Sequence, residues 1–170
     1  MTVEAWTRIR RSDRAMSSEA KIEELLIRGQ VGNTATCLDG QPFLNPNLYW
    51  YDPEHRRIYF HTAAEGRTGD NIAHNPRVCF SVAEMGRLLP ASTALEFSTE
   101  YASVVVFGRA RLVESDDEKR RGLQGLLDKY FPDLLPGEHY RPIVAEELAR
   151  TAVFAIEIEG WSGKEKVAAE

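Results

Sequence analysis

The sequence predicts a mainly β protein: a six-stranded antiparallel barrel, closed or nearly closed, with a few flanking α-helices. About six segments show the alternation, or the β-branched and aromatic content, that is typical of strands. Most of these segments follow one another through connections of hairpin length, which suit antiparallel pairs and are too short for parallel ones. Few helices separate the strands, so a doubly wound parallel sheet fits poorly.

An amphipathic helix is predicted ahead of the first strand. Ser17 and Ser18 are candidate N-caps, and the apolar residues Ile22, Leu25 and Leu26 follow at helical spacing. Gly29 then ends the pattern, because glycine commonly follows the last turn of a helix.

Three strands follow in meander order. The first covers about residues 31–38 and the second about 42–51, and the Asp39-Gly40 pair between them is a strong hairpin signal. A turn at 52–54 then leads into a third strand, which begins with RIYFH.

The middle of the chain is less regular. Residues 70–75 are long enough for about a turn and a half of helix, and VCFSV at 78–82 returns to strand. Residues 83–100 show little periodicity, so we expect a long loop there, and long loops in compact domains are often functional. The longest strand is expected at 101–113, with a bulge or tight bend at Gly108.

The best-supported helix follows this strand. Ser115 and Glu118 form a capping-box pattern, and leucines recur behind them at helical spacing. A short helix is predicted at 143–150, and a last strand at 151–159 alternates between apolar and polar residues. Residues 161–170 are expected to form a polar loop.

Length and composition favour a single domain over residues 1–170, with an N-terminal arm at about 1–12 and a C-terminal tail at about 164–170. The chain is 43% hydrophobic and 28% charged, an ordinary globular mixture. Because the net charge is -5, we expect no nucleic-acid partner. No apolar run approaches the roughly 20 residues that cross a bilayer, and the N-terminus has no secretory signal, so we expect no membrane partner and a cytoplasmic location.

Cysteine and histidine spacing gives no sign of a metal site. The two cysteines, Cys37 and Cys79, would stay free thiols in a reducing compartment and would pack as small apolar groups. None of the four histidines has a partner at the spacing of a metal motif. We therefore predict no metal.

The stretch IYFHTAAEGRTGDN at 58–71 changes from a strand into a loop of small and hydroxylated residues around one arginine. Arg67 is flanked by Gly66, Thr68 and Gly69, and Asp70 begins a short predicted helix. A guanidinium, a hydroxyl, glycine backbone and a helix N-terminus are together suited to a phosphate group. On composition alone, a solvated polar turn is the commoner explanation of such a stretch.

Four longer segments, in order along the chain, resemble those of a known family: QPFLNPNLYWYD, IYFHTAAEGRTGDNIAHNPRVCFSV, EYASVVVFGRARLVESDDEK and IEIEGWSGK. Together they resemble the pyridoxamine 5'-phosphate oxidase-like flavin-binding split barrels, and in particular the group of the nitroimidazole-resistance (Nim) proteins. RRSDRAM matches that group too, so the resemblance covers about residues 10–166. It implies a six-stranded split barrel and a homodimer with two FMN (possibly FAD) molecules at the subunit interface.

The resemblance also implies roles for individual residues. Arg67 would bind the FMN phosphate with help from Thr62 and Thr68, although the family often has a lysine where this chain has Thr68. His61 would face the ribityl chain or the ring edge and is the candidate catalytic residue. Further cofactor-binding candidates are the ring-edge strand Asn45, Pro46, Asn47 and Leu48, the second-subunit positions Tyr101 and Ser103, and Trp161 and Lys164 near the C-terminus.

Structural explanations stand beside two of these assignments. His61 at a strand end is by base rate a hydrogen-bonded histidine. The run Tyr49-Trp50-Tyr51 is more often a strand that faces core and interface alternately than a substrate cage.

The resemblance implies an FMN-dependent oxidoreductase that reduces a small electron-poor compound, such as a nitro-heterocycle or a quinone. The rival hypothesis is a non-catalytic flavin or haem binding or carrier protein, because the chain has no nicotinamide fingerprint and no catalytic triad. Oxidation of pyridoxamine phosphate itself is disfavoured, since the basic C-terminal motif for the substrate phosphate is missing. A third hypothesis is a deazaflavin-using reductase on the same barrel, which would favour a more basic cofactor groove than this acidic chain suggests.

Overall fold

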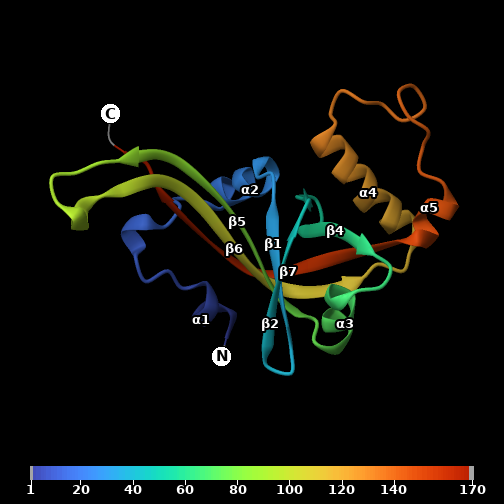
Figure 1. Cartoon of the computed structure of the whole chain (residues 1–170), viewed down its shortest axis with the longest axis horizontal. Coiled ribbons are helices and arrows are strands. Elements are labelled where there is room, and N and C mark those ends of the chain that lie inside the picture. The colour runs from blue at the N-terminus through green and yellow to red at the C-terminus, as the bar shows by residue number, and fades with distance from the viewer. Residues whose placement is uncertain (1, 169–170) are drawn as a thin grey trace.

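The structure, a computed structural model, describes residues 2–168. In this part of the chain, seven strands form one antiparallel sheet in the order β2-β1-β5-β6-β7-β4-β3 (Figure 1). The strands are β1 Gly32–Leu38, β2 Gln41–Asn47, β3 Trp50–Asp52, β4 Arg57–Ala63, β5 Arg77–Leu89, β6 Ser98–Leu112 and β7 Thr151–Lys166. The helices are α1 Val3–Thr7, α2 Glu19–Arg28, α3 Arg67–His74, α4 Asp116–Tyr130 and α5 Ala145–Arg150.

The sheet curls into a barrel that stays split between β2 and β3. These two strands are its opposite edges, yet only Leu48 and Tyr49 separate them in the chain. Tyr49 leaves the strand pattern because its N–H donates to the Tyr130 hydroxyl of α4 at 3.1 Å. The predicted mainly β split barrel is confirmed. The strand count is seven, because the predicted strand at 42–51 breaks at this point.

The barrel interior holds the main hydrophobic core. Ile22, Leu25 and Leu26 of the predicted helix α2 join it, and so does Ile72 of α3. In Figure 1 these two helices lie at opposite ends of β1. Alternate residues of the strands supply the rest, among them Ile58, Phe60, Phe80, Val82, Val104, Val106, Phe154 and Ile156.

Helix α4 covers the outside of the barrel over β3 and β4. Tyr59 is buried there with Val153, and Trp50 stacks on its ring at 5.5 Å. A Cβ at Gly125 would lie 2.2 Å from the Trp50 ring, so glycine is what lets α4 approach this closely. Tyr49 and Tyr51 are buried in the core, which agrees with the strand explanation of the aromatic run rather than a cage.

The long loop predicted at 83–100 is wrong. Strand β5 continues to Leu89 and β6 begins at Ser98, so the connection shrinks to eight residues with a 3-10 turn at Ala94–Glu96. Strands are recognised in a sequence by the alternation that one buried face imposes. No residue of this part of β5 and β6 is buried, so neither face imposes such a pattern on the sequence.

The polar loop predicted at 161–170 is also wrong, because β7 runs to Lys166 and is the longest strand, one residue longer than β6. Gly160 and Gly163 gave the segment its loop-like composition. A Cβ at Gly160 would lie 2.6 Å from Val3, and one at Gly163 would lie 2.5 Å from Met16. Both glycines thus make room for the N-terminal segment on the strand. Residues 169–170 of the predicted tail lie outside the described residues.

Glu118 at the start of α4 joins the helix to the sheet. Ser115 caps α4 by accepting from the Glu118 N–H at 3.4 Å, as predicted. The Glu118 carboxylate accepts from Arg111 at 2.6 Å and from the Tyr59 hydroxyl at 2.9 Å. The hydrogen bond from Arg111 is the main reason that the pKa of Glu118 lies below its usual range.

We expect Glu118→Gln to lower the free energy of unfolding by about 1 to 2 kcal/mol at pH 7, because charge-assisted hydrogen bonds exceed neutral ones. A depressed carboxyl pKa stabilises the fold above the unfolded-state value near 4, and this stabilisation is lost as the pH falls through the folded value. The difference from wild type should therefore shrink on acidification. Urea unfolding at pH 7 and pH 3 measures it, with Glu114→Gln, an exposed neighbour, as the control. A constant difference at both pH values would contradict the role of the charge.

No helix in residues 2–168 is both long and apolar enough to cross a bilayer.

Candidate cofactor-binding site

The predicted phosphate loop joins β4 to α3. Helix α3 begins at Arg67, three residues before the predicted start. Its N-cap, Gly66, has φ +154° and ψ +163°, a conformation that side-chain-bearing residues rarely adopt, and no side chain caps the helix. The first N–H groups of α3 are therefore free of side-chain acceptors, which is the arrangement that favours an anion.

Arg67 lies across the split of the barrel. Its guanidinium sits over the Phe43 ring of β2, with 5.1 Å between the guanidinium carbon and the ring centroid. The side chain is exposed but is not free in bulk water, because this contact orients it. Phe43 was not among the predicted residues, although it lies two positions before Asn45 and so shares its face of β2.

Thr68 and Asn45 connect the two sides of the split. Thr68 is buried, and its hydroxyl accepts a hydrogen bond from the Asn45 amide at 3.1 Å. The hydroxyl proton stays available to a ligand. An ammonium group at this depth would lose much of its hydration, so a lysine in this position would add its charge against a desolvation cost.

The remaining ring-edge candidates lie at a strand edge. Strand β2 pairs only with β1, so the backbone groups on its other side have no ladder partner in the described residues. The side-chain oxygen of Asn47 is buried without a hydrogen-bond partner, and so is the Thr34 hydroxyl. Pro46 and Leu48 are exposed. A planar ligand with polar groups on its edge would satisfy such a strand.

His61 and Thr62 lie on opposite faces of β4. Thr62 follows the inward pattern of Phe60, and its hydroxyl donates to the Ala63 carbonyl at 2.8 Å. His61 follows the outward pattern of Tyr59 and is exposed. No described residue hydrogen-bonds to the His61 ring, so the explanation as a hydrogen-bonded structural histidine gains no support.

The other predicted residues are distant from the loop within one chain. Tyr101 and Ser103 pair with Lys166 and Lys164 of β7 on the outer face of the sheet. Thr151 of β7 pairs with Ala63 beside the loop, whereas Lys164 lies roughly 40 Å further along β7 at about 3.3 Å per residue. A single chain therefore does not bring the two groups together.

Trp161 belongs to the interior. It is 8% exposed, its indole N–H donates to Glu19 at 3.2 Å, and the Arg56 guanidinium lies 4.3 Å from its ring centroid. These contacts tie β7 to α2, and leave little of the ring for a ligand.

Within residues 2–168, one group of side chains has the arrangement of possible metal ligands. Asp52, Glu54 and His55 place one ligand atom each within 4.8 Å of the others. Arg121 already pairs with both carboxylates, at 3.0 Å and 2.7 Å. Its positive charge opposes a metal ion at this position.

Residues 18–165 match the family model of pyridoxamine 5'-phosphate oxidase. The chain belongs to the pyridoxamine 5'-phosphate oxidase family. No curated protein matches the chain.

Solved structures share the fold of this family member. The flavocytochrome Anf3 from Azotobacter vinelandii is 26% identical over 96% of this chain and 74% of its own, with a TM-score of 0.83. A FAD and haem binding protein from Mycobacterium smegmatis is 24% identical over 91% and 74%, with a TM-score of 0.80. A protein described as a candidate 5-nitroimidazole antibiotic resistance protein, from Bacteroides thetaiotaomicron, is 18% identical over 89% and 86%, with a TM-score of 0.75.

These matches confirm the predicted resemblance. The fold is that of the pyridoxamine 5'-phosphate oxidase-like flavin-binding proteins, and a nitroimidazole-resistance protein is among its structural neighbours. The neighbours' names include flavin and haem, and where a name specifies the flavin it is FAD.

Proposed function

We propose that this chain is a homodimeric, flavin-dependent oxidoreductase that binds FMN, with its phosphate at Arg67. The observation that carries the proposal is the position of Arg67: at the uncapped start of α3, beside Gly66, and facing an edge strand across the split of the barrel. Membership of the pyridoxamine 5'-phosphate oxidase family supports the choice of cofactor.

The phosphate end would be held by charge and by backbone. The Arg67 guanidinium offers charge-assisted hydrogen bonds, and the first N–H groups of α3 and the Thr68 hydroxyl complete the cradle. A lysine in place of Thr68 would add a second cation. Its absence costs about 1.5 to 3 kcal/mol of binding free energy, or one to two decades of affinity.

The ring end would lie along β2. Unpaired backbone groups of this edge strand and the buried Asn47 amide oxygen suit the polar edge of an isoalloxazine ring. Tyr101, Ser103 and Lys164 would reach the cofactor from a second copy, because a single chain keeps them far from Arg67. The complete site thus requires two chains.

A bound flavin supplies hydride and one-electron chemistry, so the residues around it need only bind, orient and exclude water. His61 is exposed on the outer face of β4 and is free to donate a hydrogen bond to a reacting acceptor. A hydrogen-bond donor at His61 favours an acceptor that gains negative charge. A small, flat, electron-poor compound such as a nitro-heterocycle or a quinone fits this description.

A second candidate is a carrier that binds flavin or haem without turnover. It is favoured by the similarity to proteins whose names include both cofactors. A haem ligand would come from a histidine, and the exposed His61 and His74 are available on the described surface.

Titration of the purified protein with FMN, FAD and haemin separates these candidates. We expect FMN to bind, with its absorption bleached by a nicotinamide donor and restored by a nitroaromatic compound or a quinone. Flavin that binds but is never reoxidised by either acceptor would favour the carrier. Binding of haemin without either flavin would also favour the carrier, and binding of none of the three cofactors would contradict both candidates.

A further inference from the structure

The ends of β5 and β6 form a ribbon, residues 86–100, that projects from the barrel. The last pairing of β6 with β7 is Tyr101 with Lys166. Beyond that point the ribbon consists of two strands, and no third strand pairs with it in the described residues. In Figure 1 the ribbon is the hairpin at the far left of the view, at the end of β5 and β6. A two-stranded hairpin without a covering layer is marginal in water.

The ribbon is nevertheless well braced at its base. The Arg87 guanidinium donates to the Glu100 carboxylate at 2.9 and 3.0 Å, and the Arg87 N–H donates to it at 3.2 Å. The Thr99 hydroxyl donates to the Arg87 carbonyl at 3.1 Å, and the Ala168 N–H donates to Glu100 at 3.0 Å. These bonds fix the direction in which the tip points. Docking the tip therefore costs little further conformational entropy.

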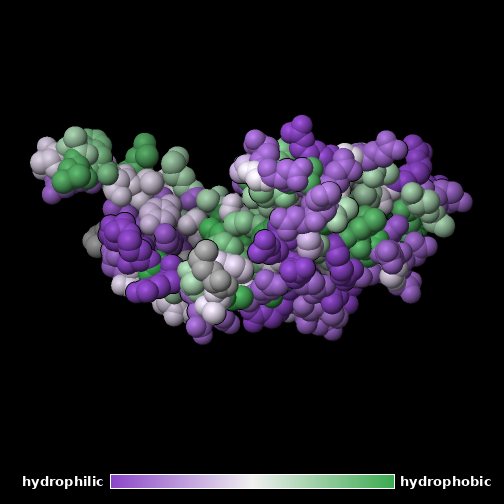
Figure 2. Space-filling model, turned by 90° about the horizontal axis from the view of Figure 1, so that it is seen from below, coloured by the Kyte–Doolittle hydropathy of each residue, from purple (hydrophilic) through white to green (hydrophobic). Residues whose placement is uncertain are grey.

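The tip of the ribbon is apolar and uncovered. Leu95 is 96% exposed, Leu88 is 73% exposed and Phe97 is 60% exposed. In Figure 2 the tip is the hydrophobic projection at the far left. Large apolar side chains gathered on a rigid projection indicate a surface that another molecule covers.

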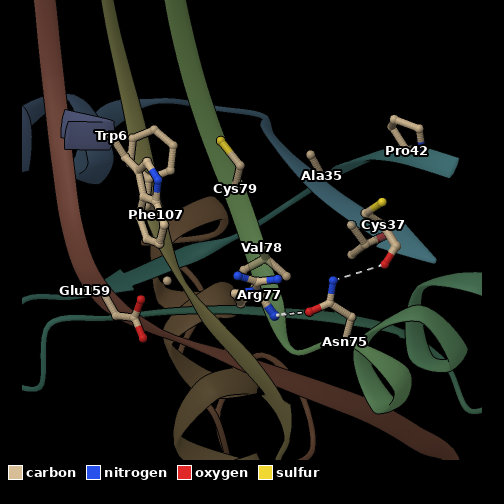
Figure 3. Close-up of a pocket in the computed structure, with 12 residues that line it drawn as sticks. Trp6, Ala35, Cys37, Pro42, Asn75, Arg77, Val78, Cys79, Phe107 and Glu159 are labelled. Carbon is tan, nitrogen blue, oxygen red and sulfur yellow. Dashed lines mark hydrogen bonds between the residues drawn. The ribbon is translucent and has the colours of Figure 1, made fainter. Parts of the chain in front are cut away.

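The same chain has a hollow suited to such a tip. A hollow of about 470 Å³ opens on the outer face of β1, β5 and β6, away from the barrel interior. Trp6, Pro42, Cys79 and Phe107 give it apolar walls, and Trp6 and Phe107 pack with ring centroids 6.2 Å apart. Figure 3 shows these side chains gathered around the opening, with Arg77 beside them.

The two surfaces are continuous and complementary. Cys79 and Met85 share a face of β5, so the hollow and the base of the ribbon lie on the same side of the sheet. The ribbon has two acidic residues, Glu96 and Glu100, against Arg87. The lining of the hollow contains one cation, Arg77, and one anion, Glu159. The excess acidity of the ribbon opposes an anionic lipid surface, whereas Arg77 of a second copy could pair with Glu96 of a docked tip.

We propose that the ribbon tip of one copy docks into the Trp6–Phe107 hollow of a second copy, and that the contact is reciprocal about a two-fold axis. The ribbon tip and the hollow are on the same chain, so each copy can offer its tip to the other copy's hollow, as an isologous contact requires. The inference rests on the proposed homodimer, and adds to it which surfaces meet. The ribbon would then hold the second copy in the position where its Tyr101 and Ser103 complete the cofactor site.

Cysteine cross-linking tests the contact directly, because the hollow contains the native thiols Cys37 and Cys79. We expect Leu95→Cys to give a covalent dimer on mild oxidation, and this dimer to disappear when Cys37 and Cys79 are both serine. A Leu134→Cys variant, with a cysteine at an exposed leucine far along the chain from the ribbon, is the control and should stay monomeric on a denaturing gel. A Leu95→Cys dimer that persists without the native cysteines would mean that two tips meet each other, and would overturn the proposal.

Sedimentation of a Leu95→Glu, Phe97→Glu variant gives an independent test. We expect its dimer dissociation constant to rise at least about tenfold, since large apolar residues at an interface centre dominate its affinity. The matched control is Leu134→Glu, Leu135→Glu, which should leave the dimer unchanged. An unchanged dimer in the ribbon variant would refute the docking while leaving the dimer and its flavin intact. A monomeric wild type would refute both, and wild-type flotation with phosphatidylcholine vesicles that the ribbon variant lacks would assign the tip to lipid instead.

Discussion

Replacing Arg67 with alanine is expected to weaken FMN binding about ten- to a hundredfold. The guanidinium is the one cation that the structure places at the start of α3 and across from β2 within the described loop at residues 62–70. A charge-assisted hydrogen bond to phosphate is worth about 1.5 to 3 kcal/mol, and at 25 °C each 1.4 kcal/mol is a factor of ten. Quenching of flavin fluorescence on titration measures the dissociation constant.

Two controls, one a variant and one a ligand, make this result specific. Arg10→Ala removes an exposed arginine in the N-terminal segment and should leave the affinity unchanged. Riboflavin, which has no phosphate, should bind wild type and Arg67→Ala equally. An Arg67→Ala protein that binds FMN as tightly as wild type would show that the loop does not hold the phosphate.

Replacing Gly108 with alanine is expected to lower the free energy of unfolding by about 3 kcal/mol or more. Gly108 lies at the predicted bulge, where the register of β6 against β7 shifts. A Cβ here would lie 2.2 Å from the Glu157 carbonyl oxygen and 3.2 Å from the Ile156 side chain. A backbone atom cannot turn aside as a side chain can, so the paired strands must move apart.

Urea unfolding followed by circular dichroism measures this loss, with Gly69→Ala as the matched control. Gly69 lies in α3, where the new Cβ would meet only the Phe154 ring at an ordinary 3.6 Å, and alanine favours helix over glycine. The control should be at least as stable as wild type. If Gly108→Ala unfolds at the wild-type urea concentration, the bulge is not a constraint on this fold.

The parts of the fold that could be predicted are those with one buried face. The Asp39-Gly40 hairpin, helix α4 and the alternating start of β7 all have this pattern, and all three are present. In the hairpin, Asp39 and Gly40 both have positive φ, +50° and +79°, as a tight turn between twisted strands requires. The ribbon at 86–100 has no buried face, and the end of β7 has glycines at positions where strands usually have larger side chains. For these reasons the sequence predicts loops in both places.

The start of α3 shows a different limit. Two glycines near residue 67 make this segment a poor helix by local propensity. Tertiary contacts decide instead: Asn71 donates to the Thr36 hydroxyl at 2.8 Å, and Asn45 donates to Thr68. Neither contact is visible before the strands are arranged in space.

The candidate site divides in the same way. Arg67 was identifiable from its glycine-flanked loop and from the family resemblance, whereas Phe43 became apparent only when β2 was placed across the split. The distance along β7 between the loop and Lys164 likewise follows from the register alone. That distance is the reason why a second copy enters the proposal.

A crystal structure of the FMN complex tests the central claim most directly. The account predicts a dimer in which the phosphate contacts the Arg67 guanidinium and the first N–H groups of α3 of one copy, while Tyr101 and Ser103 of the other copy approach the same flavin. A flavin enclosed by a single chain, or a phosphate bound away from Arg67, would contradict it.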